Sequence, residues 1–520
     1  MTYTMTRKSS SSSSWLQVAS IALLLFISHT TTPCMASSTH VREVGRPASS
    51  SFSRYSLLRK QRQDFLSTFP RGGATKPQTA AVAVAPPPSS SSKKVKVKGD
   101  GTASIPSEVF NLVKIIVGSG VLGLSSGIAA FGDNPGALVP ACALILVTGS
   151  FGAYSFNLIG RICSLTGSKS YKEAWTKSVG ESSNWFPTVC VFMVTFFSSI
   201  GYSMILTDTL KLLLKSSGIL VERSTVLLTT TVCLLLPLCL LKNLGSLAPF
   251  SLLGIVGMGY TCIAMAIRYF DQTYALPSSS SSSGAVTAGQ FLETLSEGYQ
   301  PQFGVKGASS IWSINSFIYL CMLSTAYMAH FNAPKLYVEL YNNTLPRFQK
   351  MVYFSFGFSI LIFCAMASFG FLTFGASAKG LILNNYSTKD TLMYLSRVAV
   401  AASVLFSYPL NFVGIRDSVL ELGNIPLAKR TNTYLNMMTV GLLTIVTALA
   451  LVITDLKFLL SMIGSTWGNI LIYMIPSFMF IQLSKKLPET KDTVQVTAWF
   501  TAVVGVIMTV IGTSMTLTSS

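Results

Sequence analysis

Residues 110–131 read FNLVKIIVGSGVLGLSSGIAAF, and this stretch decides the fold. It is apolar and long enough to cross a bilayer, which takes about 20 residues. Yet 118–120 read Gly-Ser-Gly at its centre, where each glycine costs a helix about 1 kcal/mol relative to alanine, and Lys114 lies within it. Non-helical backbone at membrane depth is tolerated only where protein buries it or where it lines a watery cavity. The stretch therefore predicts a helix that breaks to form a binding site, and it is equally consistent with a small-residue patch against which another helix packs.

The composition of the whole chain is that of a membrane protein. Of its 520 residues 50% are hydrophobic and only 11% are charged, whereas a soluble domain carries about 25% charged residues. The net charge of +19 lies mostly in the N-terminal tail and in short segments between apolar stretches. That is the pattern of topology signals rather than of nucleic-acid binding. The nine cysteines show no metal-ligand spacing, so we expect no metal site and no cofactor.

Eleven apolar stretches of membrane-spanning length follow residue 104, so the lipid bilayer is the expected surrounding. They cover roughly 109–131, 136–160, 187–210, 224–242, 247–270, 311–334, 351–374, 391–415, 433–453, 457–481 and 495–517. Lysine and arginine are concentrated in the segments on the side of residue 104, which predicts the N-terminus inside and the C-terminus outside. The sequon at Asn385 would then lie outside, where it could be glycosylated.

Residues 1–104 are a different kind of sequence. The apolar run 15–27 and the small residues 36–38 resemble a secretory signal peptide, and the basic, serine-rich, acid-poor sequence after them resembles a transit peptide. This order resembles the presequences of algae with complex plastids, and a disordered tail with a chance apolar run explains it as well. We therefore divide the chain into an N-terminal extension, 1–104, and a membrane domain, 105–520. The membrane expected is vacuolar, another endomembrane or the plasma membrane, with a plastid membrane as the alternative.

A second interrupted span lies five spans after the first. Within 311–343, the residues Ser324, Thr325 and Tyr327 interrupt the apolar run, and Pro334 follows. Proline bends a helix because it removes a backbone hydrogen bond. Many transporters contain two inverted five-helix repeats, each with one broken helix, and the substrate binds between the breaks. Spans one and six are corresponding positions in such a pair, which favours the broken-helix interpretation.

Six stretches of the chain resemble those of one family. They are NLVKIIVGSGVLGL from Asn111, SIGYSMILTDTL from Ser199, AHFNAPKLYVEL from Ala329, GFLTFG from Gly370, LILNNYS from Leu381 and RVAVAASVLFSYPLNFVGIR from Arg397. In this order they resemble the amino acid/auxin permease family, which has an amino acid transporter transmembrane domain, over about residues 104–517. The resemblance implies an all-α integral membrane protein of eleven transmembrane helices. The implied fold is a LeuT-like 5+5 inverted repeat plus one helix, with helices 1 and 6 broken.

The resemblance also implies secondary transport of amino acids across a membrane, as a symporter, and no enzymatic activity. Half-helix N-termini carry positive partial charge and free N–H groups, which suit a carboxylate. The expected substrate-binding residues are Val117, Gly118, Ser119, Gly120, Val121, Ser324, Thr325 and Tyr327. The expected partners are an amino acid, protons and lipid, without nucleic acid. A passive facilitator and an amino acid sensor on the same fold are the alternatives.

By the resemblance, the position of Lys114 distinguishes two groups within the family. By the resemblance, sodium-coupled members carry an asparagine four residues before the Gly-Ser-Gly, and proton-coupled members commonly carry a lysine. An ammonium would repel a sodium ion, and Ser407, which matches the family's other sodium ligand, could accept a hydrogen bond from it. His330 is a second candidate for proton transfer because histidine titrates near neutral pH. We therefore expect proton-coupled, sodium-independent transport with Lys114, Ser407 and His330 as ion-coupling residues. Two alternatives stay open: Lys114 reaching the inner surface, and His330 packed and neutral.

Overall fold

Helices cover each of the eleven apolar stretches. The computed structural model describes residues 101–241, 248–277, 288–305, 311–486 and 492–518, so the first 100 residues of the predicted extension lie outside it. The helices are α3 (Ile105–Ile116), η1 (Ser119–Gly123), α4 (Leu124–Phe131), α5 (Leu138–Thr166), α6 (Tyr171–Ser178), α7 (Trp185–Ser216), α8 (Arg223–Thr230), η3 (Thr231–Leu235), α9 (Leu236–Cys239), α10 (Ala248–Phe270), α11 (Ser316–Ala326), η7 (His330–Asn332), α12 (Ala333–Glu339), α13 (Leu345–Phe374), α14 (Thr391–Leu422), α15 (Asn432–Val452), α16 (Leu456–Ile463), η10 (Gly464–Gly468), η11 (Ile470–Met474), α17 (Ile475–Lys486) and α18 (Asp492–Thr518).

Most of these helices are long enough for a bilayer. Within the described ranges, eight are long and apolar enough to cross a membrane alone, or nine if the bent pair that makes up 105–131 is one span. The predicted fourth span is a shorter apolar helix, Arg223–Cys239, and the predicted sixth span is interrupted between α11 and α12. The all-helical membrane architecture is therefore confirmed, and the total of eleven crossings stays a prediction.

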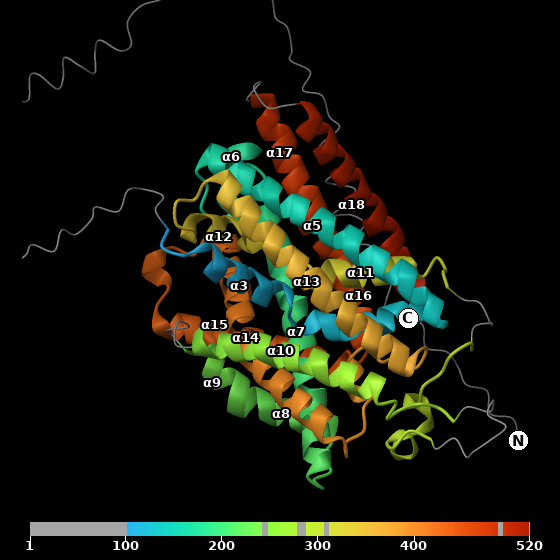
Figure 1. Cartoon of the computed structure of the whole chain (residues 1–520). Coiled ribbons are helices and arrows are strands. Elements are labelled where there is room, and N and C mark those ends of the chain that lie inside the picture. Colours follow the sequence, from blue (N-terminus) through green and yellow to red (C-terminus); the bar gives the residue numbers. More distant parts are fainter. Residues whose placement is uncertain (1–100, 242–247, 278–287, 306–310, 487–491, 519–520) are drawn as a thin grey trace, which may run out of the picture. The chain divides into compact units, whose positions relative to one another are not determined.

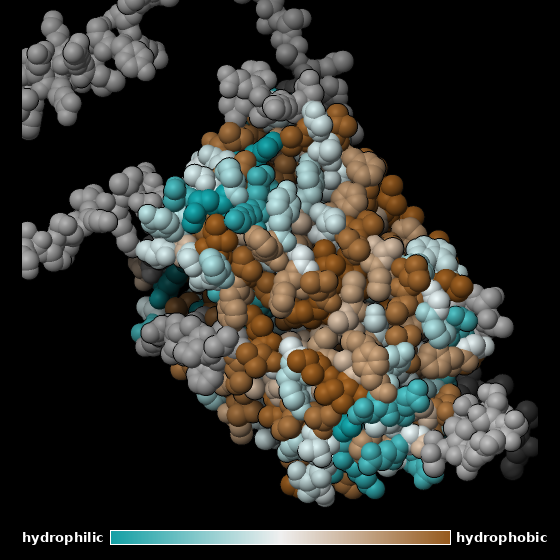
Figure 2. Space-filling view, viewed as in Figure 1, coloured by the Kyte–Doolittle hydropathy of each residue, from teal (hydrophilic) through white to brown (hydrophobic). Residues whose placement is uncertain are grey.

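The surface of the helical bundle is apolar in a broad band. Figure 2 shows hydrophobic side chains across the middle of this face, with hydrophilic ones gathered toward its two ends. Large apolar side chains are widely exposed there and elsewhere, for example Leu361 at 68% and Val452 at 78%. Exposed apolar surface of this extent would be unstable in water, and it is what lipid chains cover.

Spans that are five apart pack against each other. The second half of span one, α4, packs on α11 of span six, α5 of span two packs on α13 of span seven, and α7 of span three packs on α14 of span eight. Figure 1 shows α13 running between α3 and α5, both of which it contacts. This pairing is what two inverted five-helix repeats predict, and it brings the first and sixth spans together at the centre.

A buried charged network joins the C-terminal end of α10 to the N-terminal end of α14. Asp390 is fully buried and accepts from Arg268 Nε (2.9 Å) and Nη2 (2.7 Å) and from the Tyr274 hydroxyl (2.8 Å). It also caps α14, because its Oδ1 accepts the backbone N–H of Leu392 (3.0 Å). Arg397, equally buried, donates to three carbonyl oxygens of the loop before α14: Ser387 (3.2 Å), Leu383 (3.0 Å) and Tyr386 (2.6 Å). The network fixes the loop between α13 and α14 on the end of the bundle.

The folded chain leaves no room for a glycan at Asn385, and glycosylation of the growing chain stays a prediction. The Asn385 side chain is fully buried. Its Nδ2 donates to Ser377 O (2.9 Å), and its Oδ1 accepts the backbone N–H of Lys379 (2.8 Å). The sequon is defined by its three residues alone, whereas the burial of its amide depends on how the loop 377–385 folds back on itself.

Candidate functional site

The first break lies where the glycines predict it. α3 ends at Ile116, Val117 leaves the helix with ψ 64°, and Gly118 is extended (φ −99°, ψ −159°) before η1 begins at Ser119. The two parts of the span are bent by 41°. Because the first N–H groups of a helix have no partner within it, the start of η1 presents backbone donors at membrane depth.

The second break lies before the proline rather than at it. α11 ends at Ala326, Tyr327 to Ala329 are non-helical, and Pro334 lies in the first turn of α12. Proline is well accommodated there, because the N–H it lacks would have no partner in the helix. The break therefore lies at the expected interruption, 324–327, and the bend expected at Pro334 is wrong.

The two breaks touch each other. A Cβ atom placed on Gly120 would stand 3.3 Å from Ala326 Cα, at the end of α11. The neighbouring Thr325 hydroxyl donates to Leu460 O of α16 at 2.6 Å, which holds this end of α11. Gly120 therefore permits the close approach of spans one and six, as the small-residue alternative predicts. The helix of span one is also broken, so both interpretations of this stretch hold.

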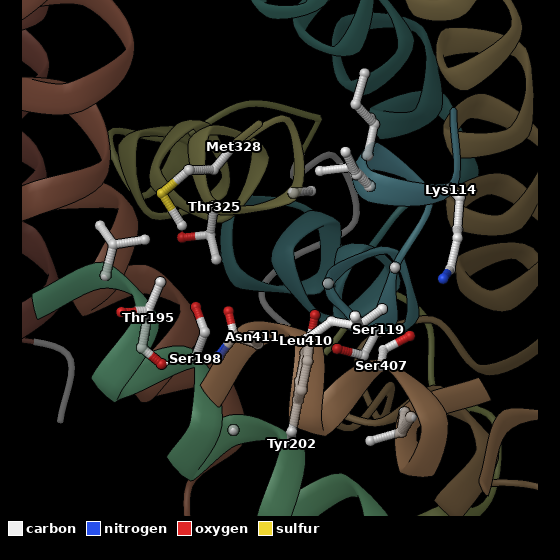
Figure 3. Close-up of a pocket in the computed structure, with 18 of the residues that line it drawn as sticks. Lys114, Ser119, Thr195, Ser198, Tyr202, Thr325, Met328, Ser407, Leu410 and Asn411 are labelled. Atoms are coloured by element: carbon white, nitrogen blue, oxygen red, sulfur yellow. Dashed lines mark hydrogen bonds between the residues drawn. The ribbon is translucent and has the colours of Figure 1, made fainter. Parts of the chain in front are cut away.

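A cavity of about 550 Å³ opens beside the breaks. Of the predicted site residues, it is lined by Lys114, Val117, Gly118, Ser119, Gly120, Thr325 and Ser407. Figure 3 shows Thr325 and Met328 across the cavity from Thr195 and Ser198, while Lys114 lies on the side of Ser119 and Ser407. The sequence thus located the cavity from its two breaks, and its volume is within the range of small-molecule sites.

Four predicted residues lie behind the cavity rather than on its wall. Val121, Ser324, Tyr327 and His330 are each at most 1% exposed, and none is among the lining residues. The Tyr327 hydroxyl donates to Ile145 O (3.2 Å), and the Ser324 hydroxyl donates to Leu320 O (3.1 Å). The side chains of Tyr327 and Ser324 therefore hold the second break in place. A substrate contact from the backbone of Val121, at the first break, stays a prediction.

His330 joins the second break to span two. Its Nε2 lies 2.9 Å from Ser155 Oγ and 3.0 Å from Gly152 O, both on α5. Its ring packs edge-on against Phe156 and Phe356. This is the packed arrangement of the alternative interpretation, and a role in proton transfer stays a prediction.

The sequence interpretation missed two polar stripes. Thr195, Ser198 and Tyr202 line the cavity from α7, and Ser403 and Asn411 line it from α14 on either side of Ser407. Their spacings, three and four residues on α7 and four and four on α14, put each set on one helical face. Polar side chains at helical spacing within an apolar span were the signal available in the sequence.

Hydrogen bonds fix these stripes. Asn411 Nδ2 donates to Thr195 O and to Ser199 Oγ, each at 2.9 Å. The Tyr202 hydroxyl lies beside the first break, 3.9 Å from where a Cβ atom on Gly118 would stand. Spans three and eight are therefore joined to each other beside the first break, at the depth of the cavity.

The charge of the cavity wall is one-sided. Lys114 of α3 and Lys335 of α12 are the charged side chains among the described lining residues, which include no carboxylate. A positive potential in a concave site attracts anionic groups. The wall, with its hydroxyls, an amide and backbone donors, suits a carboxylate and offers no counterion to a cationic side chain.

Comparison with known proteins gives the family. A family model described as transmembrane amino acid transporter protein matches residues 101–518. The chain is 26% identical over 398 residues to the putative sodium-coupled neutral amino acid transporter 11 of Danio rerio, covering 74% of this chain and 80% of that protein. It is 25% identical over 409 residues to the sodium-coupled neutral amino acid symporter 2 of Danio rerio, covering 76% and 78%. It is also 23% identical over 428 residues to the Mus musculus putative transporter 11, covering 81% and 86%.

A solved structure supports the fold. The inward facing conformation of Mhp1 matches with a TM-score of 0.50 at 10% identity, covering 81% of this chain and 92% of that chain. The expected LeuT-like arrangement is confirmed at the level of fold, consistent with the pairing of spans five apart.

Proposed function

We propose that this chain, which belongs to the transmembrane amino acid transporter family, carries neutral amino acids by secondary transport through the cavity between its two broken helices. The observation that carries the proposal is the cavity itself, where two interrupted spans meet at Gly120 and Ala326. Three relatives are named as sodium-coupled transporters or symporters of neutral amino acids. A wall without carboxylates fits that substrate class, because a cationic side chain would meet lysines there.

The substrate would bind by its backbone groups. Its α-carboxylate would accept N–H groups at Ser119, Gly120 and Val121, at the positive end of η1. Its α-amino group would donate to carbonyl oxygens near Val117 and Thr325. The side chain would then extend toward the polar stripes of α7 and α14, which set specificity.

We also propose that transport needs no sodium and is driven by protons, with passive transport as the alternative. The relatives' names point the other way. Lys114, however, lines the cavity at the position where the resemblance gives sodium-coupled members an asparagine. An ammonium cannot ligate a cation, whereas an amide oxygen can. A positive charge there would hold α3 against α14 through Ser407 in place of sodium.

Uptake in proteoliposomes tests both proposals. Vesicles loaded with unlabelled alanine, serine and glutamine should exchange these amino acids, and should not exchange lysine. Exchange should persist when choline replaces sodium at constant pH, and an imposed pH gradient should change its rate. Loss of uptake in choline would contradict sodium independence and leave coupling as the relatives' names describe it. Indifference to both ions would make the protein a facilitator, and no exchange of any amino acid would contradict transport.

Replacing Lys114 with asparagine should remove the pH dependence of uptake and introduce a response to sodium. The amide oxygen restores a neutral ligand beside Ser407, and hard cations prefer oxygen ligands. The measurement is the initial uptake rate against sodium concentration and pH. Lys215→Asn is the matched control, since Lys215 is exposed at the outer end of α7 and is not among the lining residues. A Lys114→Asn protein that behaves like the Lys215→Asn protein would remove Lys114 from the mechanism.

For residues 1–104 we propose a targeting role that delivers the membrane domain, 105–520, to an endomembrane or a plastid. A fusion of 1–104 to a fluorescent protein should enter the secretory route or a plastid, because an apolar run precedes basic, serine-rich sequence. Deletion of 15–27 from the same fusion is the control and should leave it in the cytosol. Diffuse cytosolic fluorescence from both fusions would favour a disordered tail, with the vacuolar or plasma membrane as the site of the protein.

A further inference from the structure

Glu108 is a buried carboxylate in the inner half of the first span. It lies one turn into α3, where its backbone N–H donates to Ser104 O at 3.0 Å, and it is 1% exposed. Its Oε2 is buried and has no hydrogen-bond partner among the described residues. An ionised carboxylate in such a place loses its hydration without full compensation, which costs several kcal/mol. Its protonated form avoids this cost.

The groups around Glu108 do not neutralise it. The charged neighbours within the described chain are Glu339 and Lys335 of α12, and the polar neighbour on its own helix is Asn111. Lys335 Nζ lies 4.0 Å from Glu339 Oε1, and both side chains are well exposed, at 71% and 46%. The Ser355 hydroxyl of α13, which packs along α3, donates a hydrogen bond to Val109 O (3.4 Å). Neither α13 nor α10, which also contacts α3, contributes a charged group to this set of described neighbours.

Glu108 stands at a joint between the inner halves of the two broken spans. Just before α3, Ala103 forms an isolated parallel bridge with Leu340, just after α12. Its N–H donates to Glu339 O (3.0 Å), and its carbonyl accepts the N–H of Tyr341 (2.8 Å). Gly101 lies so close to the Glu339 carbonyl that a Cβ atom would overlap it. Backbone hydrogen bonds thus join the start of α3 to the end of α12. Beside this joint lie the buried carboxylate of Glu108 and the exposed carboxylate of Glu339.

We propose that Glu108 is a proton-binding site that responds to the opening and closing of the joint between the start of α3 and the end of α12. With the inner halves packed as here, Glu108 is buried beside a second carboxylate and carries a proton. When the inner halves separate, water reaches Glu108, and the proton passes from its carboxyl oxygen to that water. Lys335 lines the substrate cavity and also faces Glu339, so this joint is connected to the site. The role in coupling rests on the proposed proton-driven transport, whereas the proton site itself does not.

Infrared spectroscopy of the full chain in lipid vesicles tests the proton site without any substrate. At neutral pH the protein should show the carbonyl stretching band of a protonated carboxylic acid, and Glu108→Gln should remove it. Glu297→Gln is the matched control, because Glu297 is an exposed carboxylate in the loop between α10 and α11, and should leave the band unchanged. Absence of the band from the unmodified protein, or its persistence in Glu108→Gln, would overturn the proposal.

A second variant covers the case in which Glu108→Gln does not fold. Glu339→Gln removes the like charge and leaves Lys335 as the charged neighbour, so the band should disappear at a lower pH than in the unmodified protein. A band that titrates as before would contradict the pairing of the two carboxylates.

Transport gives the last readout, with labelled alanine as the probe. Exchange by Glu108→Gln should lose its dependence on pH, whereas exchange by Glu297→Gln should keep it. A Glu108→Gln protein that lacks the band and keeps the full pH profile would overturn the role in coupling. If exchange depends on sodium while the infrared band of the protonated Glu108 is present, the proposed proton-driven function is contradicted and the proton site is retained.

Discussion

Replacing Gly120 with valine should reduce amino acid uptake to background while the protein still inserts and folds. A Cβ atom at this position would stand 3.3 Å from Ala326 Cα and 3.5 Å from Ala326 Cβ, already a tight contact. The two further methyl groups of valine would push the break of span one away from that of span six. A misplacement of 1 Å costs about 100-fold at a preorganised site, so we expect a loss of at least this size. The measurement is the initial rate of alanine exchange per folded molecule.

Gly357 provides the matched control for this experiment. It lies within α13, and no atom stands within 4 Å of a Cβ atom placed on it. Gly357→Val therefore introduces the same side chain into a membrane helix without a clash, and exchange should stay near that of the unmodified protein. Normal exchange by Gly120→Val would contradict substrate binding at the two breaks, and equal loss in both variants would point to a general effect of valine.

Replacing Asp390 with alanine should lower the free energy of unfolding by about 3–5 kcal/mol, the cost of removing one partner of a buried ion pair. The substitution leaves Arg268 and the Tyr274 hydroxyl without their shared acceptor. It also removes the cap of α14, which is worth about 1 kcal/mol. The measurement is unfolding by heat or denaturant in detergent.

Asp455→Ala isolates the contribution of the cap. Asp455 caps α16 by accepting the N–H of Phe458 (3.1 Å), but it is exposed, and no ion pair to it is found among the described residues. Its replacement should cost only the roughly 1 kcal/mol of a lost cap. Equal destabilisation by the two substitutions would show that the network around Asp390 adds nothing beyond capping.

The fold could be predicted from the sequence because its signals are local. Apolar runs of bilayer length gave the ranges of the helices, and Gly118 and Gly120 gave the first break because a helix tolerates glycine poorly. The polar residues 324–327 gave the second break, whereas the further bend expected at Pro334 was wrong. A proline is compatible with a bend or with the start of a helix, and only the path of the chain from Tyr327 decides between them.

The candidate site was predictable only in part. The breaks placed Lys114, Ser119, Gly120 and Thr325 on the cavity, because these residues belong to the interrupted segments. The helical spacing of Ser403, Ser407 and Asn411 indicates that they share one face of a helix, but that this face meets α7 depends on how the two helices pack. His330 was named for its chemistry, and its neighbours on α5, nearly two hundred residues earlier in the chain, fixed its place behind the cavity.

The burial of Asn385 turns its sequon into a reporter of folding. If the loop at Asn385 enters the lumen of the secretory route, oligosaccharide transfer to the growing chain competes in time with the docking of α14. A chain that folds first hides the Asn385 amide against Ser377 and escapes modification. A chain that is modified first carries a glycan where the loop must close, and it cannot reach this structure. The fraction of glycosylated protein on a gel would then measure how often oligosaccharide transfer precedes closure of the loop, and it should rise in any variant that slows this closure.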